Sequence, residues 1–305
     1  MKQKIIFLVR SFSAGGTQPL RFQKIIEFLV DEFEVHVLEI HNQKETSYIA
    51  NGIFYHKIEY TWIGKLLNPI SNANILVTKT IKRAQFLTIK TKIKRIVRNL
   101  IFPDTVIFEK RKLSKKLAEI ILEFRYTTVI CSGFPFTTMM LSKTVKNMFP
   151  EVKFIYDVGD PFYNNSQNGF IKNQLAKRFE KRYLKFIDFF VVTNADTSKH
   201  YQKNFGDLIQ SKQISIIQQG FSPEILKTLE RVEEKNNNQL KRNEIVLVYA
   251  GQLYVKLREP FPLYFAVNQW NSNNSIKLRL EMYGTFNDFF KIADYNSNDI
   301  QFKGR

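Results

Sequence analysis

One segment, Ile245-Val246-Leu247-Val248-Tyr249-Ala250-Gly251-Gln252-Leu253-Tyr254-Val255-Lys256-Leu257-Arg258-Glu259-Pro260, indicates the architecture of this chain. It begins with an unbroken apolar run, the pattern of a strand that is buried on both faces of a parallel sheet. Gly251 then permits a sharp turn. Pro260 fits the first turn of a helix, because proline lacks the N–H that would be unpaired there. We therefore predict a buried strand, a turn and a helix.

The turn after this strand carries two cations, Lys256 and Arg258. Unpaired N–H groups and the helix dipole both favour anions where a strand turns into a helix. The segment therefore predicts a phosphate site formed by Gly251 and the two cations. A buried strand followed by a solvated basic loop would have the same local pattern. The patterns in the rest of the sequence are therefore needed to choose between the two interpretations.

The first part of the chain opens with the same alternation of strand and helix. We predict a strand over Lys4–Val9, a glycine turn at Gly15 and Gly16, a helix over Thr17–Val30 and a strand over Phe33–Ile40. This is the opening βαβ unit of a doubly wound fold. The spaced-glycine fingerprint of dinucleotide sites is missing, so we expect no nicotinamide or other cofactor. A tight turn without a ligand remains the alternative interpretation.

The alternation predicts an α/β protein with two Rossmann-like domains. A chain of 305 residues is comfortable for two domains of ordinary size. Residues 221–243 include the one stretch rich in Asn, Glu and Lys, which is typical of a linker. We therefore expect an N-terminal domain over residues 1–220 and a second, incomplete domain over residues 244–305.

The net charge of +18 is concentrated between Glu59 and Asp104, where the sequence has nine cations and no acid. From about residue 74 to 101 the spacing of apolar residues predicts an amphipathic helix with a cationic face. Such a helix binds an anionic membrane surface. The residues that we expect to dock are Lys82, Arg83, Lys90, Lys94, Arg95 and Arg98.

Two other interpretations of this basic segment stay open. An ordinary surface helix packed on its own domain has the same pattern. Nucleic acid ranks lower as a partner and is not expected, because Phe86 is the one aromatic residue within residues 74–101 and offers no stacking platform.

Composition excludes several other classes of protein. A hydrophobic content of 44% excludes a disordered chain, and no apolar run reaches the roughly 18 residues of a spanning helix. The single cysteine, Cys131, cannot form an internal disulfide. The N-terminus leads directly into a strand, so we expect a cytoplasmic protein. The sequence shows no cluster of metal-ligand residues, and we expect no metal site.

Two acids follow the strand predicted over Val152–Tyr156. They are Asp157 and Asp160, in the loop Asp157-Val158-Gly159-Asp160-Pro161-Phe162. Open α/β sheets bind their ligands at the carboxyl ends of strands, so either acid is a candidate acid, base or substrate-orienting group. A helix cap or a turn with solvated acids is the alternative.

Taken in order, these motifs resemble a known family. They are Gly15-Gly16 with Arg21, Ser132-Gly133-Phe134-Pro135, the Asp157–Phe162 loop, Gln219-Gly220-Phe221, and Tyr249–Tyr254 through Arg258 to Pro260. Together they resemble the retaining GT-B glycosyltransferases of bacterial surface-polysaccharide assembly. The resemblance implies two Rossmann-like domains, a nucleotide-sugar donor held mainly by the second, an acceptor held mainly by the first, and no required metal.

The resemblance also implies roles for individual residues. Asp157 and Asp160 would be the catalytic carboxylates, with Arg21 and Ser132 on the acceptor side. The donor phosphates would be bound by Gly15, Gly16, Gly251, Lys256 and Arg258. The family loop commonly reads Asp-x-Arg-Asp-Pro-Trp; here Gly159 stands in place of the arginine and leaves the loop without an internal cation.

The expected function is therefore transfer of a sugar from a nucleotide sugar to a lipid-linked or polysaccharide acceptor, at the cytoplasmic face of the membrane. The acidic motif that relatives use for the donor would lie beyond Arg305, so the resemblance implies a C-terminally truncated chain. Two alternatives remain. One is an inactive or truncated relative that binds a membrane surface, and the other, ranked lower, is a nucleic-acid-binding α/β protein.

Overall fold

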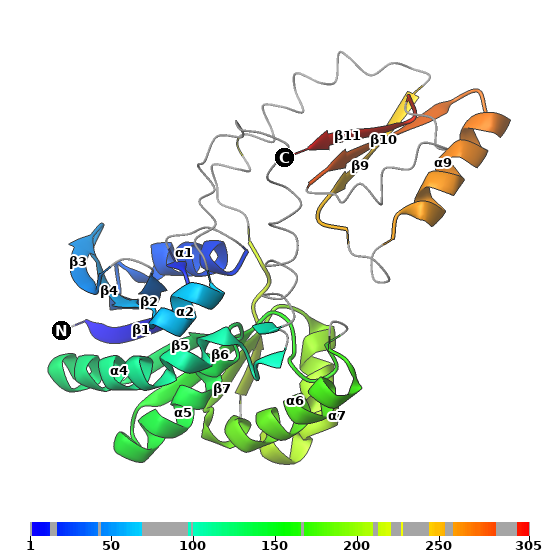
Figure 1. The fold of residues 1–305 in the computed structure, drawn as a ribbon. Helices are drawn as coiled ribbons and strands as arrows, with labels where there is room; N and C mark the ends of the chain where they lie inside the picture. Colours follow the sequence, from blue (N-terminus) through cyan, green and yellow to red (C-terminus); the bar gives the residue numbers. More distant parts are fainter. Residues whose placement is uncertain are drawn as a thin grey trace. The chain divides into compact units, whose positions relative to one another are not determined.

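The computed structural model describes residues 2–12, 17–41, 44–68, 97–98, 100–165, 168–209, 213–220, 227, 244–253, 259–284 and 298–304. The chain divides into two compact units, Met1–Gly220 and Phe221–Arg305. Each unit has its own sheet (Figure 1). The sequence prediction placed the end of the first domain at the same residue, Gly220. The linker predicted over residues 221–243 lies, except for Lys227, outside the described residues.

The first unit alternates strands and helices along the chain. Its elements are β1 (Gln3–Val9), α1 (Thr17–Leu29), β2 (Phe33–His41), β3 (Thr46–Ala50), β4 (Ile53–Glu59), α2 (Trp62–Leu67), η3 (Thr105–Glu109), α4 (Lys110–Phe124), β5 (Thr128–Ser132), α5 (Thr137–Met148), β6 (Lys153–Val158), α6 (Phe170–Tyr183), η4 (Leu184–Phe186), β7 (Phe189–Val192), α7 (Ala195–Ile209) and β8 (Gln213–Ile216).

These strands form one sheet in the order β3-β4-β2-β1-β5-β6-β7-β8. All neighbours are parallel except β3, which pairs antiparallel with β4 at the edge. The strand order reverses at β1, which pairs with β2 on one side and β5 on the other. Ligands of open α/β sheets bind at this kind of reversal.

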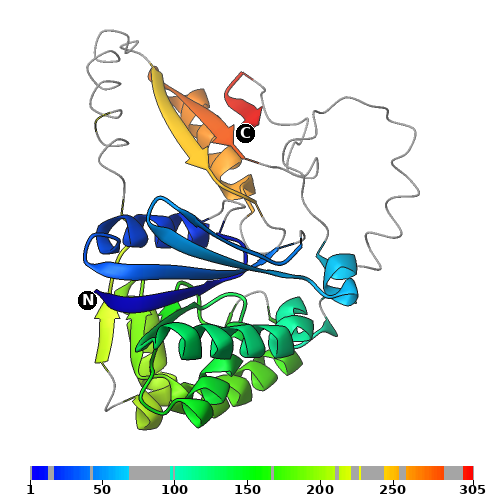
Figure 2. The ribbon, with the colours of Figure 1, turned by 90° about the vertical axis from the view of Figure 1, so that its left-hand side faces the viewer.

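Helices cover both faces of the sheet, as the alternation of β1 requires (Figure 2). Phe7 lies in the core with Phe22 of α1, whereas its neighbour Leu8 lies in the core with Leu117 of α4 and Met139 of α5. Successive side chains of a strand point to opposite faces, so an apolar run such as Ile5–Val9 serves two cores at once. This arrangement confirms the predicted doubly wound fold of residues 1–220.

A buried pair of histidines joins β2 to β4. Nδ1 of His36 lies 2.8 Å from Nε2 of His56, and the His36 ring stacks on Phe54 at 4.2 Å. Burial lowers the pKa of each imidazole to about 4. The pair is therefore neutral near pH 7, where one ring donates and the other accepts.

We expect this pair to make stability depend on pH. In the unfolded chain each histidine takes up a proton below about pH 6.5, but in the folded protein only near pH 4. Stability should therefore rise with pH across this window, by up to about 3 kcal/mol for each ring. The double variant His36→Phe/His56→Leu should have a flatter profile in urea unfolding at successive pH values. Equal slopes for parent and variant would contradict the interpretation.

The described part of the second unit contains β9 (Glu244–Ala250), α9 (Phe261–Asn273), β10 (Lys277–Tyr283) and β11 (Ile300–Gly304). The strands form a parallel sheet in the order β11-β10-β9. Tyr264 and Val267 of α9 are buried with Leu280 and Met282 of β10. The sequence also predicts a helix near residues 287–293, which lies outside the described residues.

The burial predicted for β9 is wrong, although its strand and its parallel pairing are correct. Val246 is 40% exposed and Val248 63% exposed, whereas Leu247 and Tyr249 pack on the core of this unit. The reason is that α9 packs on one face of this sheet, and among the described residues no helix packs on the other. The alternate side chains of β9 face away from α9 and are therefore exposed.

The structure also corrects two smaller predictions in the first unit. It adds β3, which pairs with β4 from Thr46↔Lys57 to Ala50↔Ile53 and which the sequence reading passed over. It also extends α7 to Ile209, whereas the sequence predicts a short helix over Ala195–Lys203.

Candidate functional site

A cavity of about 1260 Å³ lies in the first unit, at the carboxyl ends of its parallel strands. Five strands contribute lining residues at or just after their ends: Arg10 follows β1, Gly133 follows β5, Gly159 follows β6, Thr193 follows β7 and Gln219 follows β8. This is the edge of the sheet where the strand order reverses. A cavity of this size is larger than most small-molecule sites, which measure about 300–1,000 Å³.

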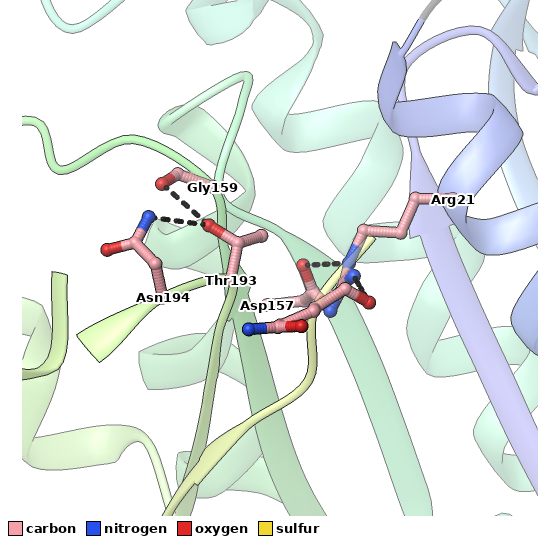
Figure 3. Close-up of polar contacts among 6 residues, drawn as sticks. Arg21, Asp157, Gly159, Thr193 and Asn194 are labelled. Carbon is pink, nitrogen blue, oxygen red and sulfur yellow. Dashed lines mark hydrogen bonds and ion pairs between the residues drawn. The ribbon is translucent and has the colours of Figure 1, made fainter. Parts of the chain in front are cut away.

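An ion pair between Arg21 of α1 and Asp157 of β6 lies in the wall of this cavity (Figure 3). Nε of Arg21 donates to both carboxylate oxygens at 3.1 Å, and Nη2 lies 3.1 Å from Oδ2. Nη1 donates to the carbonyl oxygen of Gln218 at 3.2 Å. Only 5% of Arg21 and 2% of Asp157 are exposed, so the geometry is fixed from all sides.

The electrostatics of this pair are set by burial. Loss of water raises the pKa of Asp157, and the neighbouring guanidinium of Arg21 partly offsets that rise. Nη2 of Arg21 is buried and makes no hydrogen bond of good geometry within the described structure. The pair thus places a guanidinium group in the cavity wall, where Asp157 holds it.

The loop that carries Asp160 is held by buried side chains. Glu180 of α6 accepts hydrogen bonds from the backbone N–H groups of Phe162 at 3.4 Å and Tyr163 at 2.8 Å, and from the hydroxyl of Tyr201 at 2.6 Å. Burial raises the pKa of Glu180 to about 7, although these three donors act in the opposite direction.

At the start of this loop, Oγ1 of Thr193 donates to the carbonyl oxygen of Gly159 at 3.4 Å (Figure 3). Asp160, the residue after Gly159, is exposed and lines the cavity. The anchored loop therefore presents a carboxylate to whatever the cavity binds.

The turn after β5 leaves no room for a side chain at Gly133. Its N–H donates to the carbonyl oxygen of Asp157 at 2.6 Å, and a Cβ atom there would lie 2.9 Å from that oxygen and 3.0 Å from Cα of Val158. Both atoms belong to the backbone of β6, so neither can move without shifting the strand that carries Asp157.

Replacing Gly133 with alanine should therefore lower the free energy of unfolding by about 1–3 kcal/mol. Gly206→Ala is the matched control, because a Cβ atom there meets nothing within 4 Å. In that variant stability should stay equal or rise slightly, since alanine favours a helix. Urea unfolding of both variants checks the prediction. Equal effects in the two variants would show that a Cβ atom at Gly133 does not clash with the backbone of β6.

Of the other predicted site residues, Ser132 is buried and engaged within its own turn. Its Oγ donates to the carbonyl oxygen of Phe134 at 2.5 Å and accepts from the N–H of that residue at 3.3 Å. It is not among the residues that line the cavity, so its position does not support the predicted acceptor contact. Gly251 follows β9 in the second unit, where its N–H donates to the carbonyl oxygen of Tyr283 at 2.9 Å.

Several predicted residues lie outside the described part of the chain. These are Gly15, Gly16, Lys82, Arg83, Lys90, Lys94, Arg95, Lys256 and Arg258. Most of the helix predicted over residues 74–101 falls there too, while residues 97, 98 and 100 are helical. Arg98, predicted to dock on a membrane, is exposed and lines the cavity.

Arg10 and Asp104 are polar residues of the cavity that were not predicted from the sequence. Nε of Arg10 donates to the hydroxyl of Tyr60 at 3.2 Å and Nη2 to Oδ1 of Asn68 at 2.7 Å. Asp104 accepts hydrogen bonds from the N–H and the hydroxyl of Thr137, and burial raises its pKa. Arg10 could have been found, because it is the first residue after β1 and therefore lies at a strand end.

No group of three or more potential ligand residues among the described residues could hold a metal ion. The same part of the chain contains no helix with the length and apolarity needed to cross a bilayer.

Comparison with known proteins adds to this geometry. Neither the protein-family models nor the curated proteins contain a match. Among solved structures, sucrose-phosphate synthase of Thermosynechococcus elongatus superposes with a TM-score of 0.62 at 10% identity, over 100% of this chain and 71% of that protein. It is a GT-B glycosyltransferase. The chain has a GT-B fold.

Two further GT-B structures also superpose on this chain. The trehalose-6-phosphate structure from E. coli with bound UDP-2-fluoro glucose gives a TM-score of 0.57 at 8% identity, over 96% of this chain and 67% of that one. Trehalose-6-phosphate synthase, described as transferring glycosyl groups with retention, gives 0.57 at 10% identity, over 96% and 66%. At such identities the likeness establishes the fold, and the GT-B expectation from the sequence is confirmed at that level.

Proposed function

We propose that this GT-B protein is a retaining glycosyltransferase, which moves a sugar from a nucleotide sugar to a lipid-linked or polysaccharide acceptor at the cytoplasmic face of the membrane. The observation that carries the proposal is the cavity at the carboxyl ends of β1, β5, β6, β7 and β8, with a buried cation and an exposed carboxylate in its wall. Structural similarity to enzymes of nucleotide-sugar chemistry supports the same class of reaction.

In this proposal the cavity of the first unit receives the acceptor. Asp160 accepts a hydrogen bond from the acceptor hydroxyl and orients it for attack. Arg21, which lines the cavity, binds a neighbouring oxygen of the acceptor. Asp157, expected from the sequence to act as an acid or base, has both oxygens paired with Arg21, so we assign it the positioning of that guanidinium.

The donor belongs to the second unit. Gly251, Lys256 and Arg258, together with Gly15 and Gly16, are proposed to bind its phosphates. During transfer the bond between the sugar and the diphosphate breaks, a bond to the acceptor oxygen forms on the same face of the sugar, and the hydroxyl proton passes to the departing diphosphate. Negative charge grows on that diphosphate, which is where preorganised cations lower a barrier most.

A thermal-shift screen of nucleoside diphosphates and nucleotide sugars tests this proposal. A bound ligand stabilises the folded protein by mass action, so one nucleotide class should raise the melting temperature of the parent. Arg258→Ala should lose that rise, whereas Lys203→Ala, which removes an exposed cation of α7, should keep it. If no nucleotide shifts the parent, the chain is better explained as a relative that binds membranes without catalysis.

A further inference from the structure

The mouth of the cavity carries an apolar patch that the sequence analysis did not find. Its residues come from three segments and all line the cavity: Leu100, Phe134, Phe170, Ile171 and Leu175. Phe170 and Ile171, the first two residues of α6, are 81% and 75% exposed, and Leu100 is 79% exposed. Single exposed apolar residues are ordinary, but a cluster around one cavity marks an interaction surface.

Two cations lie beside this patch. Arg98 and Lys172 line the same cavity mouth. Farther along α6 the exposed positions Arg178, Lys181 and Arg182 are all basic, and the one acid of that helix, Glu180, is buried. The exposed stripe of α6 thus changes from apolar at its N-terminal end to cationic at its C-terminal end.

We infer that the N-terminal end of α6 inserts into an anionic lipid bilayer, so that the cavity opens directly onto the membrane surface. Exposed apolar side chains can insert among the acyl chains, while the cations beside them contact the anionic headgroups. The inference rests on the proposed function for its membrane location. It differs from docking through residues 82–98 alone, because insertion of Phe170 and Ile171 adds a contribution that salt does not screen.

The geometry explains why these two residues are displayed here. Ala176, Phe179 and Tyr183 of the same helix are buried in the core of the unit, which fixes the orientation of α6. Phe170 and Ile171 project from the end of a rigid helix at the cavity, so their insertion would also hold the cavity at the depth of the headgroups. A lipid-linked acceptor could then enter without leaving the bilayer.

Co-sedimentation with vesicles of phosphatidylcholine and phosphatidylglycerol tests the inference without any sugar donor. The parent should bind. The double variant Phe170→Ser/Ile171→Ser should bind at least about tenfold more weakly, because it loses two apolar side chains. The matched control is Phe28→Ser/Leu122→Ser, which removes two side chains that are 75% and 66% exposed but do not line the cavity. Its binding should equal that of the parent.

The salt dependence of vesicle binding distinguishes insertion of this patch from docking through residues 82–98. The parent should keep measurable binding at high ionic strength, where the Phe170→Ser/Ile171→Ser variant should lose it. Equal binding by parent and variant would overturn the inference and assign docking to residues 82–98. Absence of any vesicle binding would overturn it as well, in favour of a protein partner, while leaving the nucleotide screen of the proposed function as a separate result.

Depth of insertion gives an independent readout. With the two natural tryptophans, Trp62 and Trp270, replaced by phenylalanine, Phe170→Trp supplies a single fluorophore at the patch. Its emission should shift to the blue on vesicle binding, and lipids brominated along the acyl chain should quench it. Binding without quenching would place the patch outside the bilayer and contradict the inference.

Discussion

Replacing Arg21 with methionine should lower the free energy of unfolding by about 3–5 kcal/mol, the usual cost of removing one partner from a buried ion pair. The effect should be large because Asp157 is 2% exposed and both of its oxygens accept from Nε of Arg21. Lys24→Met, on the same helix, is the control, since the Lys24 ammonium bonds the carbonyl oxygen of Gly220 at the surface. That change should cost less than about 1 kcal/mol. Urea unfolding measures both.

A double variant separates stability from function. Arg21→Met/Asp157→Leu leaves no buried charge at this position, so it should recover most of the stability lost by Arg21→Met alone. Glycosyl transfer should stay lost in both variants, because neither has a guanidinium in the cavity wall. Recovery of activity together with stability would show that Arg21 has a purely structural role.

Replacing Glu180 with alanine should have a similarly large effect on stability. The change leaves the buried hydroxyl of Tyr201 and the N–H groups of Phe162 and Tyr163 without their acceptor. Each unsatisfied buried donor costs about 1–3 kcal/mol, so a total above about 3 kcal/mol is expected. Glu119→Ala is the control, because Glu119 is half exposed and makes long ion pairs with neighbouring lysines on α4. Its cost should stay below about 0.5 kcal/mol.

The pH dependence of a Glu180→Gln variant tests the environment of this carboxyl group. The pKa of Glu180 is raised from 4.5 to about 7, so the folded protein binds a proton that the unfolded chain releases between these values. The contribution of Glu180 to stability is therefore full below about pH 4.5 and falls by about 3 kcal/mol as the pH rises through 7. Glutamine does not titrate, so the cost of the variant should shrink by this amount between acidic and alkaline pH. A cost that is independent of pH would contradict the raised pKa.

The arrangement of elements in the first unit could be predicted from local patterns. Apolar runs such as Ile5–Val9 and the helical spacing within Thr17–Val30 identify parallel strands and covering helices, and the order of elements then implies a doubly wound sheet. β3 escaped this reading because Thr46–Ala50 is largely exposed at the sheet edge and has no apolar periodicity. The exposure of β9 could not be predicted, because it depends on which face of the sheet a helix covers.

The candidate site was predictable only in part. Arg21 and Asp157 were each singled out, but their pairing spans 136 residues of sequence and depends on where α1 packs over the sheet. No local periodicity contains that information. The Asp157–Phe162 loop is an example. It has Gly159 where the family commonly has an arginine, and the cation that pairs with Asp157 is Arg21 of α1, from a distant part of the chain. The apolar residues around the cavity were missed for the same reason.

The most direct test of the account is release of nucleoside diphosphate from a panel of nucleotide sugars, with lipid extracts of bacterial membranes supplied as the source of acceptor. The account predicts that the parent releases nucleoside diphosphate from at least one nucleotide sugar, that release depends on the extract, and that Arg21→Met/Asp157→Leu loses it while remaining folded. Release by that variant at the rate of the parent, or no release from any nucleotide sugar, would contradict it.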